Sequence, residues 1–117
     1  MIVCVPVDGV GAVDPRWGRA DRLALAETQD GHIVGWREVD VMWSVLHDQA
    51  TEGSHHARVV RFLRENGVEV VVAGHMGDGM AHTLGKMGLR VHLGASGDAR
   101  GAVETLTKDD PAADSPE

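Results

Sequence analysis

Short apolar runs and amphipathic segments alternate along the chain, which predicts a sheet covered by helices. Residues 2–7 form a β-branched run that ends at Asp8-Gly9, a pattern typical of a buried strand. Two further strands are expected at residues 23–28 and 33–39, because the Asp-Gly pair within residues 29–32 is a strong hairpin signal. These two strands are therefore predicted to be antiparallel.

The second half of the chain alternates between helix and strand. A helix is expected from Ser54, which serves as its cap, to Asn66-Gly67, with an apolar stripe that includes Val59 and Leu63. The next segment, 68–73, is almost entirely β-branched, as in a central parallel strand. The alternation then continues with a helix over 80–87, a strand over 89–93 and a helix that Asp98 caps and that runs through Leu106.

The resulting order, β-β-β-α-β-α-β-α, predicts an α/β fold with a mixed sheet and helices packed against it. Residues 40–51 have no clear pattern, and they either extend the preceding strand or form an irregular excursion. Residues 108–117 contain four acids and two prolines without a large apolar side chain, so we expect a disordered acidic tail. The folded domain is thus predicted to span residues 1–107.

Composition is that of one soluble domain: 117 residues, 43% hydrophobic and 25% charged. No apolar run approaches the roughly 20 residues of a membrane-spanning helix, and the first residues lack the features of a secretory signal. We therefore expect a cytoplasmic protein with no membrane partner. The net charge of −7 argues against binding to nucleic acid.

One cysteine and seven histidines define the available chemistry. Cys4 alone forms neither an internal disulfide nor a thiolate cage, and its place in a buried strand predicts an inert thiol. No serine stands in a nucleophile elbow, and acids do not gather at strand ends as a metal nuclease needs. The histidines are the better candidates, because histidine is the commonest metal ligand.

Two glycine-rich segments follow predicted strands. Residues 9–14 resemble a dinucleotide-binding loop, but a hairpin rather than a helix comes next, so a plain turn is expected. Residues 74–79 lie between a strand and a helix, where free N–H groups and the helix dipole favour an anion. A turn without any ligand explains them equally well. Asp78 is interpreted as a helix cap.

Four histidines flank this second loop in the predicted topology. His47, His55 and His56 lie at or before the start of the first helix, and His75 follows the central strand. These positions can meet at one edge of the sheet and hold a metal, although the spacing matches no zinc signature and each histidine is also explained as exposed or hydrogen-bonded. His32 is expected to be solvated, and His82 and His92 are interpreted as structural.

Several motifs together resemble the dinitrogenase iron-molybdenum cofactor biosynthesis family, also called nitrogenase accessory factor-like. They are the opening residues 1–7, Trp17-Gly18-Arg19-Ala20, the histidines at the first helix, residues 67–77 and residues 94–99. The resemblance covers the whole predicted domain. One position departs from the family pattern, because Arg16 stands where members often have a histidine linked to cluster binding.

The resemblance implies a ribonuclease H-like three-layer α/β/α domain without nuclease activity, whose five-stranded sheet has its second strand antiparallel to the others. It implies a non-enzymatic carrier of a metal–sulfur cluster of the iron–molybdenum type. The residues expected at the cofactor are Arg16, Arg19, Gly74, His75, Met76 and Gly77, with His47, His55, His56 and His75 as metal ligands. A protein that donates or accepts the cluster is an expected partner, and the chain is expected to be a monomer or weak homodimer.

Three alternatives remain open from the residues themselves. The histidines hold a divalent metal instead of a cluster. Alternatively, the loop at 74–79 binds a phosphate or nucleotide in an enzyme or sensor, with His75 as acid or base. The third is an interaction domain in which Trp17, Trp36 and Trp43 form a partner surface.

Overall fold

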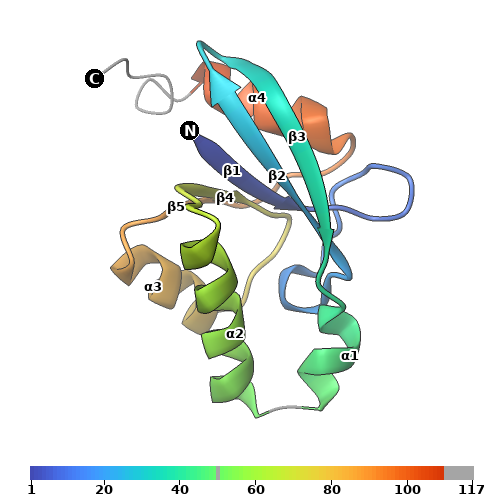
Figure 1. The fold of residues 1–117 in the computed structure, drawn as a ribbon, viewed down its shortest axis with the longest axis vertical. Coiled ribbons are helices and arrows are strands. Elements are labelled where there is room, and N and C mark those ends of the chain that lie inside the picture. Colours follow the sequence, from blue (N-terminus) through green and yellow to red (C-terminus); the bar gives the residue numbers. More distant parts are fainter. Residues whose placement is uncertain (50, 110–117) are drawn as a thin grey trace.

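The chain folds into five strands, four α-helices and one short 3-10 helix within the residues that the structure, a computed structural model, describes: 1–49 and 51–109 (Figure 1). In chain order these elements are β1 (Ile2–Pro6), η1 (Trp17–Arg19), β2 (Arg22–Gln29), β3 (His32–Asp40), α1 (Trp43–Asp48), α2 (Glu52–Glu65), β4 (Val70–Val72), α3 (Asp78–Lys86), β5 (Arg90–His92) and α4 (Ala99–Asp109).

The five strands form one mixed sheet in the order β3-β2-β1-β4-β5. Strand β2 runs antiparallel to both β1 and β3, whereas β1, β4 and β5 are parallel. Strand β2 is therefore the one strand of this sheet that opposes the other four. The predicted α/β class and mixed sheet are confirmed.

The hairpin between β2 and β3 forms where the Asp-Gly pair predicts it. Asp30 and Gly31 both have positive φ angles, 53° and 79°, and Gln29 pairs with His32 across the turn. Two successive left-handed residues match the natural twist of paired strands, which is why Asp-Gly favours this turn.

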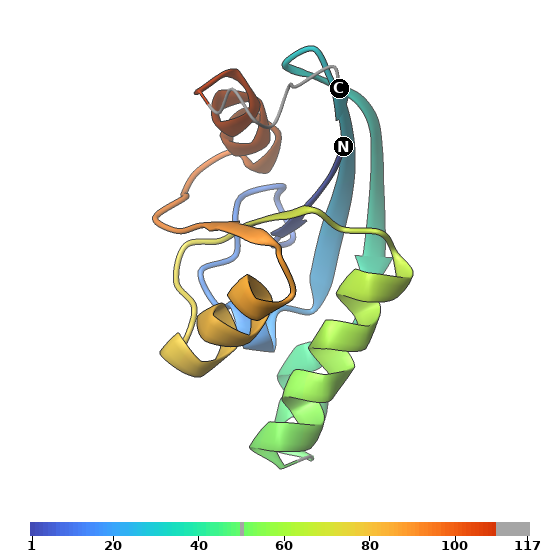
Figure 2. The same cartoon turned by 90° about the vertical axis from the view of Figure 1, so that its left-hand side faces the viewer.

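The sheet is covered on both faces, because the buried apolar residues form two separate clusters. One cluster joins Trp43 of α1, Leu63 of α2 and Leu84 of α3 to one face of the strands. The other joins Val103 and Leu106 of α4 to the opposite face. In both views α4 lies near the hairpin end of β2 and β3, away from α1, α2 and α3 (Figures 1 and 2).

Three local predictions need correction at helix starts. Thr51, not Ser54, caps α2: its hydroxyl accepts from the Ser54 N–H at 3.1 Å. Gly77 is the cap position of α3, so Asp78 is its first residue and not its cap. The unassigned stretch contains helix α1, and β3 ends at Asp40. The cap at Asp98 is confirmed, since its carboxylate accepts from the Gly101 N–H at 2.8 Å.

Element ends also differ from the prediction. The strands predicted at 68–73 and 89–93 are three residues each, although Glu69 and Ala73 still donate backbone hydrogen bonds at 2.9 Å to Ile2 and His92 of the neighbouring strands. Helix α4 continues to Asp109, two residues beyond the predicted end of the domain at residue 107. Thr107 is buried, and its hydroxyl donates to the Gly31 carbonyl at 3.3 Å. The rest of the predicted tail, 110–117, lies outside the described residues.

Within the described part of the chain, every helix is too short or too polar to cross a membrane.

Candidate functional site

A cavity of about 270 Å³ opens at the start of α3, where four elements meet. Its walls come from η1, α1, the first turns of α2 and the first turn of α3, and consist of Trp17, Gly18, His47, His55, His56, Gly77, Asp78, Gly79 and Met80. Three of the four histidines predicted as metal ligands therefore line one cavity.

The start of α3 forms part of the cavity wall. No side chain caps the helix among the described residues, and Gly77 to Gly79 lie at the cavity wall. The free N–H groups and the helix dipole give this end a partial positive charge. Asp78 partly offsets that charge.

His55 is buried and has both ring nitrogens occupied. Its Nε2 lies 2.8 Å from the carbonyl oxygen of Gly18, and its Nδ1 lies 3.0 Å from a guanidinium nitrogen of Arg58. Because a carbonyl only accepts and a guanidinium only donates, the proton is assigned to Nε2 and the ring is neutral. Burial lowers the pKa of His55, which favours the same neutral form. Binding a metal here requires breaking one of these hydrogen bonds.

His47 differs from His55, because its Nδ1 is buried and has no hydrogen-bond partner. The carboxylate of Asp48 lies 3.5 Å from this nitrogen, beyond a good hydrogen bond. Its ring stands edge-on to His55, with 4.9 Å between ring centroids. His56 also lines the cavity and makes no hydrogen bond with the described residues. Among the three histidines of the cavity, His47 and His56 are thus the two whose side chains make no hydrogen bond within the described residues.

Trp17, another residue of the cavity lining, has the second unpartnered polar atom. Its side chain is 2% exposed, and its indole Nε1–H is buried without an acceptor. From the sequence, Trp17 belongs to a family motif and to a candidate tryptophan surface, and neither assigns its indole N–H to the site. The missing acceptor becomes visible only in the three-dimensional arrangement.

His75 lies elsewhere. Its side chain is exposed, and it is not among the residues that line the cavity. Two of its neighbours in the glycine loop, Gly74 and Met76, also do not line the cavity. Met76 is in the apolar core, and a side chain at Gly74 would meet the Ala95 carbonyl at 3.1 Å and Pro15 at 3.5 Å. Gly74 therefore serves close packing, and Gly77 is the loop residue of the predicted set that reaches the cavity.

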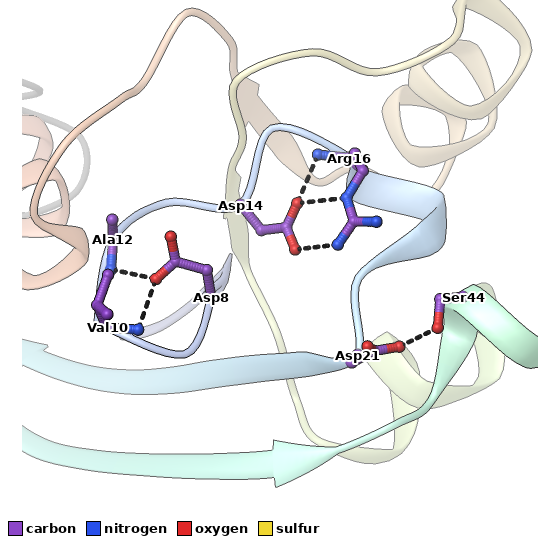
Figure 3. Close-up of polar contacts among 7 residues, drawn as sticks. All are labelled: Asp8, Val10, Ala12, Asp14, Arg16, Asp21 and Ser44. Carbon is purple, nitrogen blue, oxygen red and sulfur yellow. Dashed lines mark hydrogen bonds and ion pairs between the residues drawn. The ribbon is translucent and has the colours of Figure 1, made fainter.

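The two arginines predicted at the cofactor already have carboxylate partners. The guanidinium of Arg16 donates twice to Asp14, at 3.1 and 3.0 Å, and the Arg16 backbone N–H adds a third bond at 2.9 Å (Figure 3). These hydrogen bonds raise the pKa of Arg16. Asp14 is 3% exposed, so Arg16 neutralises a buried charge. Arg19 pairs with Asp48 at 3.1 Å on the surface.

The loop after β1 is a turn, as predicted. The Asp8 carboxylate accepts from the N–H groups of Val10 and Ala12, both at 2.9 Å, which closes the turn and lowers the pKa of Asp8 (Figure 3). Cys4 is fully buried in β1, and burial raises the pKa of its thiol. Neither feature forms a reactive site.

The proposed tryptophan surface is wrong. Trp17 and Trp43 are 2% and 1% exposed and pack edge to face, with ring centroids 5.6 Å apart. Trp36 is on β3, where the Arg100 guanidinium stacks on it at 4.5 Å. The three rings are thus divided between the core and a separate surface position.

Within residues 1–49 and 51–109, no three His, Cys, Asp or Glu side chains are placed to hold a metal ion together. A closed divalent site needs about four ligands. The cavity instead offers two open histidines, an unpartnered indole N–H and a helix N-terminus. These groups fit an anionic metal complex that brings most of its own ligands.

The fold and this cavity define a small α/β protein with a candidate ligand site at a helix N-terminus. The family model described as "Dinitrogenase iron-molybdenum cofactor" matches residues 1–109, and the chain belongs to that family. No curated protein matches the sequence at a significant level.

Solved structures share the fold. The protein PH0822 superposes with a TM-score of 0.75 at 16% identity, covering 94% of this chain and 93% of that one. The apo form of the orange protein from Desulfovibrio gigas gives 0.74 at 22% identity, covering 92% and 88%. A putative NifB protein from Thermotoga gives 0.65 at 19% identity, covering 92% and 87%.

Proposed function

We propose that this protein is a non-enzymatic carrier that binds a metal–sulfur cluster of the iron–molybdenum type in the cavity between α1, α2 and the start of α3. The family supports a role connected with a metal cofactor. The observation that carries the site is the pair of buried, unpartnered nitrogens, His47 Nδ1 and Trp17 Nε1, on two residues that line the cavity.

In this proposal His47 and His56 are the candidate metal ligands, and the N–H groups of α3 face the negative charge of the cluster. A bound cluster supplies its own sulfide ligands and leaves the protein to provide one or two nitrogens. His55 holds the cavity wall through Gly18 and Arg58 instead of binding metal. A site with so few protein ligands suits a carrier, since few bonds must break when the cluster is released.

The phosphate or nucleotide enzyme is the weaker alternative. It relies on His75 as acid or base, yet His75 is exposed and lies outside the cavity. A divalent ion held by several histidines has less support for the reason given above, namely that no three ligating side chains converge in the described structure.

The proposal extends to the finer features that the family resemblance implies. The parallel β1, β4 and β5 with an adjoining hairpin support the ribonuclease H-like class. A cytoplasmic location, a cluster donor or acceptor as partner, and a monomer or weak homodimer complete the proposal.

Reconstitution of the untagged full chain tests this function. The protein is incubated without oxygen with iron, molybdate and sulfide, passed over a desalting column, and analysed for metals and sulfide. We expect retained iron, molybdenum and sulfide in the wild type and a large loss in a His47→Ala/His56→Ala double variant. The matched control is a His75→Ala/His82→Ala double variant, which removes two histidines outside the cavity. Equal retention by both variants contradicts the site.

A further inference from the structure

We infer that Trp17 is a specificity-determining residue whose indole N–H donates a hydrogen bond to an acceptor atom of the bound cofactor. This inference rests on the proposed function. The indole N–H of Trp17 would select ligands that present a sulfide, oxo or carboxylate acceptor at this wall, and it would disfavour a bare cation.

The first support is that the indole is held in a fixed position. Its ring packs edge to face against Trp43, and Trp17 begins η1, where Arg19 N–H donates to Arg16 at 3.0 Å. The next residue, Gly18, is bound by the His55 imidazole at 2.8 Å.

The second support is the usual behaviour of buried tryptophan. A buried indole N–H normally has a partner, because leaving a donor unpaired in the interior is costly. Trp36, which is only half-buried, has a partner for its indole, since its Nε1 donates to the Glu38 carboxylate at 3.0 Å. Trp17 breaks the rule at a cavity wall, beside a helix start that is uncapped in the described structure.

The third support is the sign of the surrounding charge. An indole nitrogen donates only and cannot ligate a metal. Together with the N-terminus of α3, it makes this wall attractive to a negative ligand and unattractive to a bare cation. The open nitrogens of His47 and His56 then contact a metal only when that metal arrives inside an anionic complex.

The indole N–H signals of the ¹⁵N-labelled full chain provide the test. Three such signals are expected, assigned by through-space contacts and by a Trp36→Phe variant. The probes are tetrathiomolybdate, an anion that carries molybdenum and sulfide, and Zn²⁺. Binding of each probe is measured separately by equilibrium dialysis with metal analysis.

We expect tetrathiomolybdate to move the Trp17 indole proton downfield, as a new hydrogen bond does, while the Trp36 signal stays in place. We also expect Trp17→Phe to weaken tetrathiomolybdate binding about tenfold, and Trp36→Phe to leave it unchanged. Zn²⁺ should bind more weakly than the anion.

Bound tetrathiomolybdate with an unmoved Trp17 signal overturns the role of Trp17 but leaves the carrier function standing. Tight Zn²⁺ binding that depends on His47, without anion binding, overturns the inference and the cluster while retaining a metal site. If neither probe binds and reconstitution also fails, both proposals are wrong. The wild-type signal decides the matter even if Trp17→Phe does not fold.

Discussion

His55 on α2 donates its Nε2–H to the carbonyl oxygen of Gly18 at 2.8 Å, across 37 positions of sequence. This bond fixes η1, and with it Trp17, against the helix that carries His56. His55, the most buried of the three cavity histidines, is thus a structural link between two walls of the cavity.

Replacing this link should destabilise the fold. We expect His55→Ala to lower the free energy of unfolding by about 2–4 kcal/mol, because it opens a cavity and leaves the Gly18 carbonyl and Arg58 without their partner. Urea denaturation monitored by circular dichroism measures the change. His32→Ala, at an exposed position beside the hairpin turn, is the control and should change stability by less than about 0.5 kcal/mol.

Two glycines should respond to alanine with opposite signs. Gly74→Ala places a methyl group 3.1 Å from the Ala95 carbonyl, and we expect a loss of about 1–3 kcal/mol. A Cβ atom added at Gly85, inside α3, would meet no other atom within 4 Å. Gly85→Ala should therefore stabilise the fold by about 0.5–1 kcal/mol. The two variants are compared with the wild type by their thermal unfolding midpoints. An unchanged midpoint for Gly74→Ala would argue against close packing of the loop on Pro15 and Ala95.

The Arg16 side chain should matter for stability through Asp14. Arg16→Ala leaves a carboxylate that is 3% exposed without its guanidinium, so we expect it to lower the free energy of unfolding more than Arg19→Ala does. Arg19→Ala breaks only the exposed pair with Asp48 and should cost less than about 0.5 kcal/mol. Chemical denaturation of both variants at pH 7 measures the difference, and equal effects would contradict the assigned role of Arg16.

The free energy of unfolding should depend on pH through the ionisation of Asp8. Hydrogen bonds from Ala12 and Val10 lower its pKa in the folded state, so ionised Asp8 stabilises the fold above its unfolded pKa of about 3.9. This contribution is lost as the pH falls through the lower, folded pKa. Comparing unfolding of wild type and Asp8→Asn between pH 2 and 6, we expect their difference in stability to shrink toward low pH. A difference that is constant over this range would show that the charge of Asp8 has no effect.

The sequence predicts much of this fold because its signals are local. The Asp-Gly turn, the β-branched runs and the Asp98 cap each depend on a few neighbouring residues, and each is found in the structure. Helix α1 was not predictable, because its six residues are held by packing of Trp43 and not by a periodic apolar face.

The site was harder to predict than the fold. The grouping of His47, His55 and His56 follows from topology, but their different states depend on contacts with Gly18 and Arg58 that no spacing reveals. Trp17 is the clearest example, since only the absence of an acceptor in space distinguishes it from an ordinary core residue.

The most direct test of the central claim is the elemental content of untagged protein, purified without oxygen from its native cells. A tag would add histidines that bind metal. The carrier account predicts iron, molybdenum and sulfide near one cluster per chain, and the His47→Ala/His56→Ala variant isolated in the same way should lack them. Wild-type protein without metal, which also fails to take up a cluster on anaerobic incubation, would contradict it.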